Sequence, residues 1–447
     1  MTPIKKLFSA SALLAGLLIL TGCAGRSADD LYALPRQSEE YYALQTAIDS
    51  VMTGSCSYSA PVSGSNQQAV QLSDLDGDGQ DEAIVFLKSV EDQPLKVHIF
   101  TQRNDAYESI AVMEGNGSAF DSVEYADLDG LPGQEILVGK RISDQVLQSL
   151  SVYTCRDGRM VELLNTNYSE FRTVDLDGDE RRELFVLRPE TQERAAIAEL
   201  YSYENEQLQR QGEASLSVDA QSVRRIISGL MSPDTPAVFV ASTYDETSII
   251  TDIFALREGT FLNVSAAGET GLSTQTVRSY TSYATDIDGD GLIELPSLMA
   301  LPSYEADTET FWLIDWYNLY PDGARQVKLT TYHNHSAGWY LTIPGSWHGN
   351  LTVSRSTEEV AGVRGLVFSR WKGREATPEE IFTLYAFTGR DREALASSDG
   401  RFFVAQKGET VYAARLGTGA WAQEQNSQTI SGMFHFIQVN WNSGDVS

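Results

Sequence analysis

The stretch DLDGDGQDEAIVF, residues 74–86, joins an acidic, glycine-containing loop to an apolar strand and decides the fold. Related stretches begin at Asp127 (DLDGLPGQEILVG), Asp175 (DLDGDERRELFVL) and Asp286 (DIDGDGLIELPSL). The first two intervals are 53 and 48 residues, and the third, of 111 residues, is about two periods. A degenerate copy, GLMSPDTPAVFVA, begins at Gly229 within that long interval. Five copies at this period indicate a repeated supersecondary unit.

Each unit has the same predicted layout of an apolar strand, the acidic loop, a second strand and two further strands. In the first unit the last three strands are expected at Ala83–Leu87, Leu95–Phe100 and Tyr107–Met113. Four strands in about 50 residues are the unit of a β-propeller blade. The strands Phe311–Leu319 and Gln326–Tyr332 would complete a fifth blade and close the ring near Asn334. The sequence therefore predicts a mainly β fold with a propeller of about five four-stranded blades, and six or seven blades are the alternative.

The repeats resemble the FG-GAP or VCBS type of integrin α-chain propellers and many bacterial surface proteins, over roughly Ala69 to His333. In that family an Asp-rich loop joins the first two strands of a blade. The resemblance implies a propeller that acts as an adhesion or recognition module, although a fold alone does not identify a partner.

The acidic loops have the composition of a calcium site. Ca2+ takes six to eight oxygen ligands, and a D-x-D-x-D-G-x-x-E loop supplies them from one short turn. The most complete ligand sets, which include one backbone carbonyl each, are Asp74, Asp76, Asp78, Gln80 and Glu82; Asp286, Asp288, Asp290, Leu292 and Glu294; and Asp175, Asp177, Asp179, Arg181 and Glu183, with Glu180 in place of a glycine. A less complete set is Asp127, Asp129 and Glu135, in which Leu131 takes the place of the third Asp. We expect two to three structural calcium ions, with calcium sensing as the alternative role.

The N-terminus has the layout of a bacterial lipoprotein signal peptide. Lys5 and Lys6 precede an apolar run that ends in Leu20-Thr21-Gly22-Cys23, which resembles a lipobox. The resemblance implies cleavage after residue 22, a lipid on Cys23 and an extracytoplasmic protein anchored to a bacterial membrane. Residues 23–55 would then form the lipidated tether and a short helix with Ser38 as its N-cap.

The composition changes after the last repeat, because all seven tryptophans lie between Trp312 and Trp441. This change predicts a propeller at residues 56–335 and a smaller α+β or all-β domain at residues 336–447. The opening hairpin, GWYLTIPGSWHGNLTVSR, resembles PsbP-like or Mog1-like domains of secreted bacterial proteins. The tryptophans are expected to pack in the core, and stacking on sugars or contact with a protein is the alternative.

The charge excludes one class of partner. With 62 Asp plus Glu against 33 Lys plus Arg, the net charge of −29 would repel nucleic acid. The five histidines lie in no catalytic motif, although His333 and His335 could offer two ligands to a transition metal with no evident third. Cys56 and Cys155 could pair or remain thiols.

These features predict a membrane-anchored, calcium-binding propeller lipoprotein that recognises a protein or a glycan, and they favour this role over that of an enzyme. The alternatives are a hydrolase or lyase with its site in the central pocket of the propeller, and an accessory or sensor subunit of a membrane complex.

Overall fold

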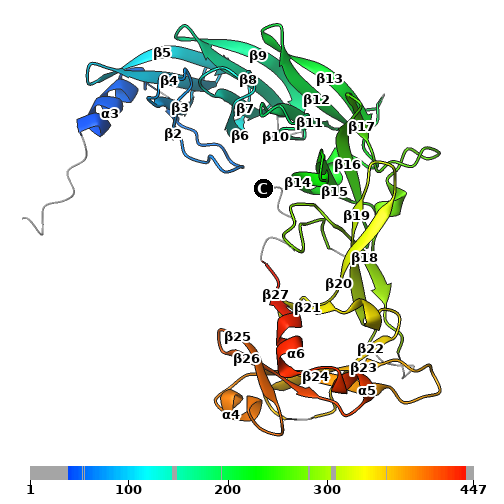
Figure 1. The fold of residues 1–447 in the computed structure, drawn as a ribbon. Helices are drawn as coiled ribbons and strands as arrows, with labels where there is room; N and C mark the ends of the chain where they lie inside the picture. The colour runs from blue at the N-terminus through cyan, green and yellow to red at the C-terminus, as the bar shows by residue number, and fades with distance from the viewer. Residues whose placement is uncertain are drawn as a thin grey trace, which may run out of the picture.

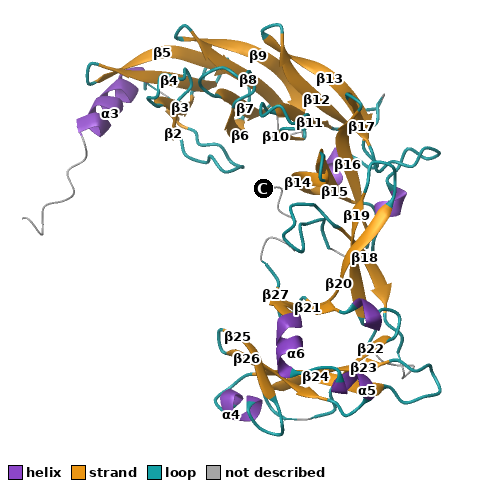
Figure 2. Ribbon diagram, viewed as in Figure 1, coloured by secondary structure: helices purple, strands orange, loops and turns teal. Residues whose placement is uncertain are grey.

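The computed structural model describes residues 39–438, except residues 53, 55, 143–147, 193, 280–281, 304–308 and 359. The predicted signal peptide, Cys23, the tether, Ser38 and Trp441 lie outside this part of the chain. Six antiparallel sheets of four or five strands make up most of the described residues, which confirms the predicted mainly β class (Figure 2).

The first four sheets repeat one pattern in which each strand pairs with the next along the chain. Their strands are β2 (Val70–Ser73), β3 (Glu82–Lys88), β4 (Leu95–Arg103) and β5 (Ala106–Gly115); β6 (Ala119–Ala126), β7 (Glu135–Arg141), β8 (Gln148–Arg156) and β9 (Arg159–Tyr168); β10 (Glu170–Val174), β11 (Glu183–Arg188), β12 (Ile197–Glu204) and β13 (Gln207–Ser215); β14 (Val223–Ser232), β15 (Thr235–Thr243), β16 (Ile249–Arg257) and β17 (Thr260–Asn263). The predicted strand order within the repeat is confirmed, and in the first three sheets the acidic loop lies between the first two strands.

The second strand of each unit forms the core because both of its faces are covered. In β3, six of the seven residues are buried, which explains the unbroken apolar run that follows Glu82. The first sheet also receives β1 (Ser57–Tyr58) on β3, and helix α3 (Glu39–Val51) packs Ile48 against the apolar side chains of Val85 and Leu87.

The hairpin that joins the third and fourth strands turns through two residues with positive φ in each of these four sheets. The first example is Asn104 and Asp105, at 49° and 63°. The others are Asp157 and Gly158, Asn205 and Glu206, and Glu258 and Gly259. Such turns match the right-handed twist of the strands, so the repeat preserves turn geometry even where Gly is absent.

The fifth sheet extends beyond the predicted domain boundary. Its order is β18 (Leu295–Ala300), β19 (Trp312–Leu319), β20 (Arg325–Asn334), β21 (Trp339–Ile343) and β27 (Phe434–Phe436). The boundary predicted between residues 335 and 336 falls in the turn between the paired strands β20 and β21. The strand before its acidic loop is reduced to a single bridge between Thr285 and Glu294.

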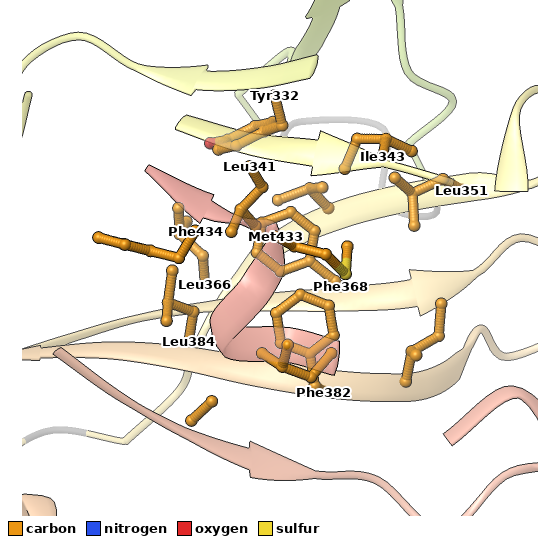
Figure 3. Packing of buried hydrophobic residues seen from close by; sticks show 14 of the residues in the cluster. Tyr332, Leu341, Ile343, Leu351, Leu366, Phe368, Phe382, Leu384, Met433 and Phe434 are labelled. Carbon is orange, nitrogen blue, oxygen red and sulfur yellow. The ribbon is translucent and has the colours of Figure 1, made fainter. Parts of the chain in front are cut away.

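The sixth sheet lies in the C-terminal part and packs against the fifth. Its order is β22 (Leu351–Arg355), β23 (Val363–Arg370), β24 (Glu379–Phe387), β26 (Thr410–Leu416) and β25 (Phe402–Lys407). The helices here are α4 (Arg392–Ala396), α5 (Ala420–Gln423) and α6 (Ser427–Met433). Among the described residues, 3-10 turns are formed by Ala220–Ser222, Thr274–Thr276 and Gly345–Trp347. Figure 3 shows the shared core, in which Tyr332 and Leu341 of the fifth sheet pack with Phe368 and Phe382 of the sixth, beside Met433 of α6. The rings of Tyr332 and Phe368 lie 5.2 Å apart.

The sheets follow one another in an open arc, with α3 at one end and the sixth sheet at the other (Figure 1). Each sheet packs on its neighbour in sequence, as β9 does on β5 and β13 does on β17. The closure expected near Asn334 is not seen among the described residues, because β20 pairs there with β21 and the chain continues into the sixth sheet. The successive four-stranded sheets resemble propeller blades, but among the described residues they form an open arc.

Candidate metal sites in the acidic loops

The first acidic loop brings three carboxylates together. Oxygens of Asp74, Asp76 and Asp78 lie within 4.8 Å of one another. The backbone N–H groups of Gly77 and Gly79 donate to the two oxygens of Asp74 at 2.7 and 3.0 Å. Both glycines have positive φ, of 75° and 85°, which the loop requires in order to curl around the carboxylates. No ion pair with a Lys or Arg neutralises this cluster within the described part of the chain.

Glu82 closes the same loop from the core side. Glu82 is fully buried, with 0% of its surface exposed, and its Oε2 accepts a hydrogen bond from the backbone N–H of Leu75 at 3.0 Å. Its Oε1 is buried and has no hydrogen-bond partner among the described residues. Burial raises the pKa of Glu82, the hydrogen bond from Leu75 lowers it by less, and the charge of Asp76 raises it further. The pKa therefore lies above its ordinary value. A buried carboxylate oxygen without a donor beside three more carboxylates is the arrangement that a cation would satisfy.

The loop at Asp286 repeats this geometry with two differences. Asp286, Asp288 and Asp290 converge within 4.8 Å, and Glu294 accepts from the backbone N–H of Ile287 at 3.1 Å. Lys328 Nζ, however, lies 2.7 Å from Asp290 Oδ2, and the Asn318 amide donates to Glu294 Oε1 at 2.7 Å. Burial raises the pKa of Glu294 to about 7. Two of the acceptors expected to bind the cation are therefore already engaged.

In the loop at Asp175, the converging group is Asp175, Asp177 and Glu183. Asp179, expected as a ligand, instead pairs with the guanidinium of Arg181, whose Nε donates at 2.8 Å. Glu180 takes the glycine position with φ of 72°, and its N–H still donates to Asp175 Oδ2 at 3.2 Å. The loop thus keeps its backbone path without the glycine, and burial raises the pKa of Glu183 to about 7.

The loop at Asp127 also brings its acids together, although it lacks the third Asp. Asp127, Asp129 and Glu135 lie within 4.8 Å, and burial raises the pKa of Glu135 to about 7. Arg156 Nη2 lies 3.3 Å from Asp129 Oδ2, so a cationic side chain already neutralises part of the cluster.

The three residues expected to offer backbone carbonyls lie inside the loops, where their N–H groups donate to the preceding Asp side chain. These bonds are 2.8 Å for Gln80, 2.9 Å for Arg181 and 2.9 Å for Leu292. In the fourth unit, Ser232 and Thr235 pair across a tight turn, and no acidic group forms there among the described residues.

Neighbouring loops are bonded to one another, a feature that the motif did not predict. The N–H of Gln134 donates to the carbonyl of Asp74 at 3.1 Å, and that of Arg182 donates to the carbonyl of Asp127 at 3.2 Å. Each donor stands directly before the Glu of its own loop. The sequence feature that could have indicated this contact is Gly133. An added Cβ there would lie 2.5 Å from the carbonyl oxygen of Leu75, so the close approach of the two loops requires a glycine.

The other candidate chemistry does not assemble into a site. Cys56 and Cys155 are free thiols and do not form a disulfide with each other. Burial raises the pKa of Cys155 to about 11. The rings of His333 and His335 lie 5.2 Å apart. No third ligand joins them among the described residues, where the groups that could hold a metal ion are those of the four acidic loops. Within the described residues, no helix has the length and apolar character needed to span a membrane.

Comparison with known proteins gives little similarity. No family model matches the chain, and no curated protein matches it. A solved structure of a protein from Lactobacillus plantarum is similar over 72% of this chain and 85% of its own, at 10% identity and a TM-score of 0.28.

Proposed function

We propose that the chain is a calcium-binding recognition protein, anchored outside the cytoplasm by a lipid on Cys23, whose arc of blades is stiffened by ions in its acidic loops. The observation that carries the proposal is the first loop, where three converging Asp carboxylates meet the unpartnered, buried Oε1 of Glu82. Four clusters of three carboxylates occur at the same position of the repeat, although the unpartnered glutamate oxygen is found in the first loop. Oxygen-only donor sets of this type suit a hard cation such as Ca2+.

The ions would act mainly on stability. Without a cation, the clustered carboxylates repel one another and the glutamates are held in an apolar environment that disfavours their charge. Extracellular calcium modules bind with a Kd of about 10⁻⁴ to 10⁻³ M. At calcium tenfold above Kd, each site would add about 1.4 kcal/mol to the free energy of unfolding. Because the loops are bonded to one another, an ion in one loop would also hold its neighbour.

Recognition of a protein or glycan is the role that a rigid, calcium-stabilised arc supports best. A strongly acidic, repetitive scaffold offers a fixed surface for such contacts. Lipidation would hold the protein at the membrane despite its net negative charge.

Thermal unfolding tests the calcium proposal. The melting temperature of the protein is expected to rise by several degrees between excess chelator and millimolar calcium. Asp74→Asn should remove a large part of that rise, whereas Asp92→Asn, which replaces an exposed Asp outside the loops, should preserve it. Equal melting temperatures with chelator and with calcium would overturn the proposal.

Membrane attachment is tested separately in a bacterial host grown with a labelled fatty acid. The wild-type chain should take up the label and sediment with membranes, and Cys23→Ser should do neither. Labelling of the Cys23→Ser variant would exclude the proposed anchor.

A further inference from the structure

A cavity of about 410 Å³ lies between the fifth and sixth sheets. Strands β18 to β21 line one side of it, and β22, β23, β24 and β26 line the other. Its volume is in the range of small-molecule sites, which often lie where two structural units meet. Figure 1 shows that the β20–β21 hairpin leads directly into the sixth sheet, so one continuous segment of chain holds both walls.

The charged side chains at this cavity are mainly basic. Arg355 and Glu309 both line it and pair with each other, at 2.6 Å from Nη2 to Oε2, which leaves Arg364 as the unbalanced charge. Arg364 also lines the cavity, is exposed, and has no ion pair or hydrogen bond among the described residues. An unpaired guanidinium at a cavity is notable in a chain with a net charge of −29, because nearly two acidic residues are available for each basic one. This local charge favours an anionic ligand and would concentrate it at the cavity.

The aromatic lining supplies a flat surface. Trp312 is 43% exposed, whereas Trp316, Trp339 and Trp347 are 2 to 3% exposed and belong to the core. An exposed indole that lines a cavity can stack on a planar or pyranose ring. Trp316, Trp339 and Trp347 therefore have the packing role that the sequence favours.

Polar groups without a partner complete the wall. His333 lines the cavity, and both of its ring nitrogens are buried with no hydrogen-bond partner among the described residues. A neutral imidazole carries one donor and one acceptor, a pair that hydroxyl groups satisfy and that a purely apolar ligand leaves unpaired. Thr310, Asn334 and Ser336 add further polar side chains to the same lining.

We propose that this cavity binds a short acidic saccharide, with a sugar ring on Trp312, its carboxylate on Arg364, and its hydroxyls toward His333 and Asn334. The inference rests on the proposed recognition function and names the ligand class and the place where it binds. A neutral sugar would leave Arg364 unpaired, and an aromatic acid would leave the polar wall unsatisfied.

Calorimetric titration of the calcium-loaded full chain with di- and trigalacturonate tests the assignment. Binding is expected, and it should weaken as salt is added because the ion pair is exposed. The methyl esters of the same saccharides, which lack the negative charge, should bind at least tenfold more weakly.

Two variants locate the site. Trp312→Ala and Arg364→Gln should each weaken binding at least tenfold, and Phe403→Ala and Arg374→Gln are the matched controls, since neither residue lines the cavity. Their calcium-dependent rise in melting temperature should equal that of the wild type, which separates loss of this site from failure of the calcium proposal. Binding that the cavity variants leave unchanged, absence of binding, or preference for 4-hydroxybenzoate over the saccharides would overturn the inference.

Discussion

At the scale of single residues, the four acidic loops differ in the basic side chains that reach them. Lys328 forms an ion pair with Asp290 in the loop at Asp286, whereas the loop at Asp74 has no such ion pair among the described residues. A cation entering the Asp286 loop must displace the Lys328 ammonium or bind beside it. Lys328→Gln should therefore raise the calcium affinity of that loop about two- to tenfold, a range consistent with a partly exposed ion pair.

This change can be measured by calcium titration in a background of Asp74→Asn and Asp175→Asn, which leaves the Asp286 loop as the most complete site. Lys372→Gln is the matched control, because it removes an ion pair with Glu379 in the sixth sheet. If the Lys328→Gln variant binds calcium more weakly than its background, Lys328 orders the loop and does not compete with the cation.

The buried glutamates predict an unusual pH dependence for the metal-free protein. Burial raises the pKa of Glu183 and Glu294 to about 7 in the folded state, above the ordinary value of 4.5. Between these values the folded protein holds protons that the unfolded chain releases, so this contribution to stability is complete below pH 4.5 and is lost as the pH rises through 7. Calcium requires the ionised carboxylates, so its stabilising effect should increase over the same range.

Melting temperatures from pH 5 to 8 with chelator, and again with calcium, measure both trends. The double variant Glu183→Gln/Glu294→Gln isolates the two groups, because Gln stays neutral throughout. In chelator its melting temperature should fall less than that of the wild type as the pH rises. An identical slope for wild type and variant would show that these carboxyl groups are already ionised in the metal-free fold.

The positions of the acids were predictable from the sequence, but their charge partners were not all visible there. The spacing of Asp74, Asp76 and Asp78 places them in one turn, and the structure brings them together. Arg156 and Lys328 lie 27 and 38 residues beyond the acids that they contact, and only the pairing of later strands brings them back. Arg181 follows its partner by two residues, yet the motif assigned it a carbonyl ligand and overlooked its side chain.

At the scale of elements, the acidic loops form a bonded series along the first three sheets. Gly133 has φ of 107°, and a Cβ at this position would lie 2.5 Å from the carbonyl oxygen of Leu75 in the preceding loop. Gly133→Ala should therefore reduce the free energy of unfolding by about 2 kcal/mol, from the unfavourable backbone conformation and the separation of the two loops.

The reduction should be larger in calcium than in chelator, because the ion fixes the loop against which the new methyl group presses. Chemical denaturation in both conditions measures it, and Gly373→Ala, at a positive φ of 96° with open space around it, is the control for the conformational cost. Equal losses for the two variants would mean that the inter-loop contact contributes nothing.

The element scale was also where sequence reasoning succeeded most clearly. The strands expected at Leu95–Phe100 and Tyr107–Met113 correspond to β4 and β5, each a few residues longer than predicted. Strand β27 was missed as a member of the fifth sheet because it pairs with β21 across 93 to 97 residues, from Leu341 to Phe434 and from Trp339 to Phe436. Strand β21 was missed because it follows the boundary predicted at residue 335, although a short turn joins it to β20. A repeat period contains no information about a strand supplied from outside the repeat.

At the scale of the whole molecule, the repeat predicts how each sheet is built more strongly than how the sheets are arranged. The same four-stranded unit can stand in a closed ring or in an open arc, and the difference depends on what the last unit meets. Here the fifth sheet meets β21, β27 and the sixth sheet, and its inner residues Leu313 and Tyr332 share one core with Phe368 and Phe382. The C-terminal part therefore acts as the continuation of the arc.

This arrangement predicts that the chain cannot be divided at residue 335 without loss of stability. A fragment that ends there would lack β21 and β27, would expose the edge of β20, and would leave Leu313 and Tyr332 without their partners in the sixth sheet. Exposed edges and apolar faces of this kind promote aggregation. Residues 39–335 should therefore melt at a lower temperature than residues 39–447 or aggregate, even in saturating calcium, as measured by calorimetry and light scattering. The sequence boundary predicts the opposite result, a soluble fragment with the same calcium-dependent transition as the longer chain, and that result would show that the fifth sheet is complete with β18 to β20 alone.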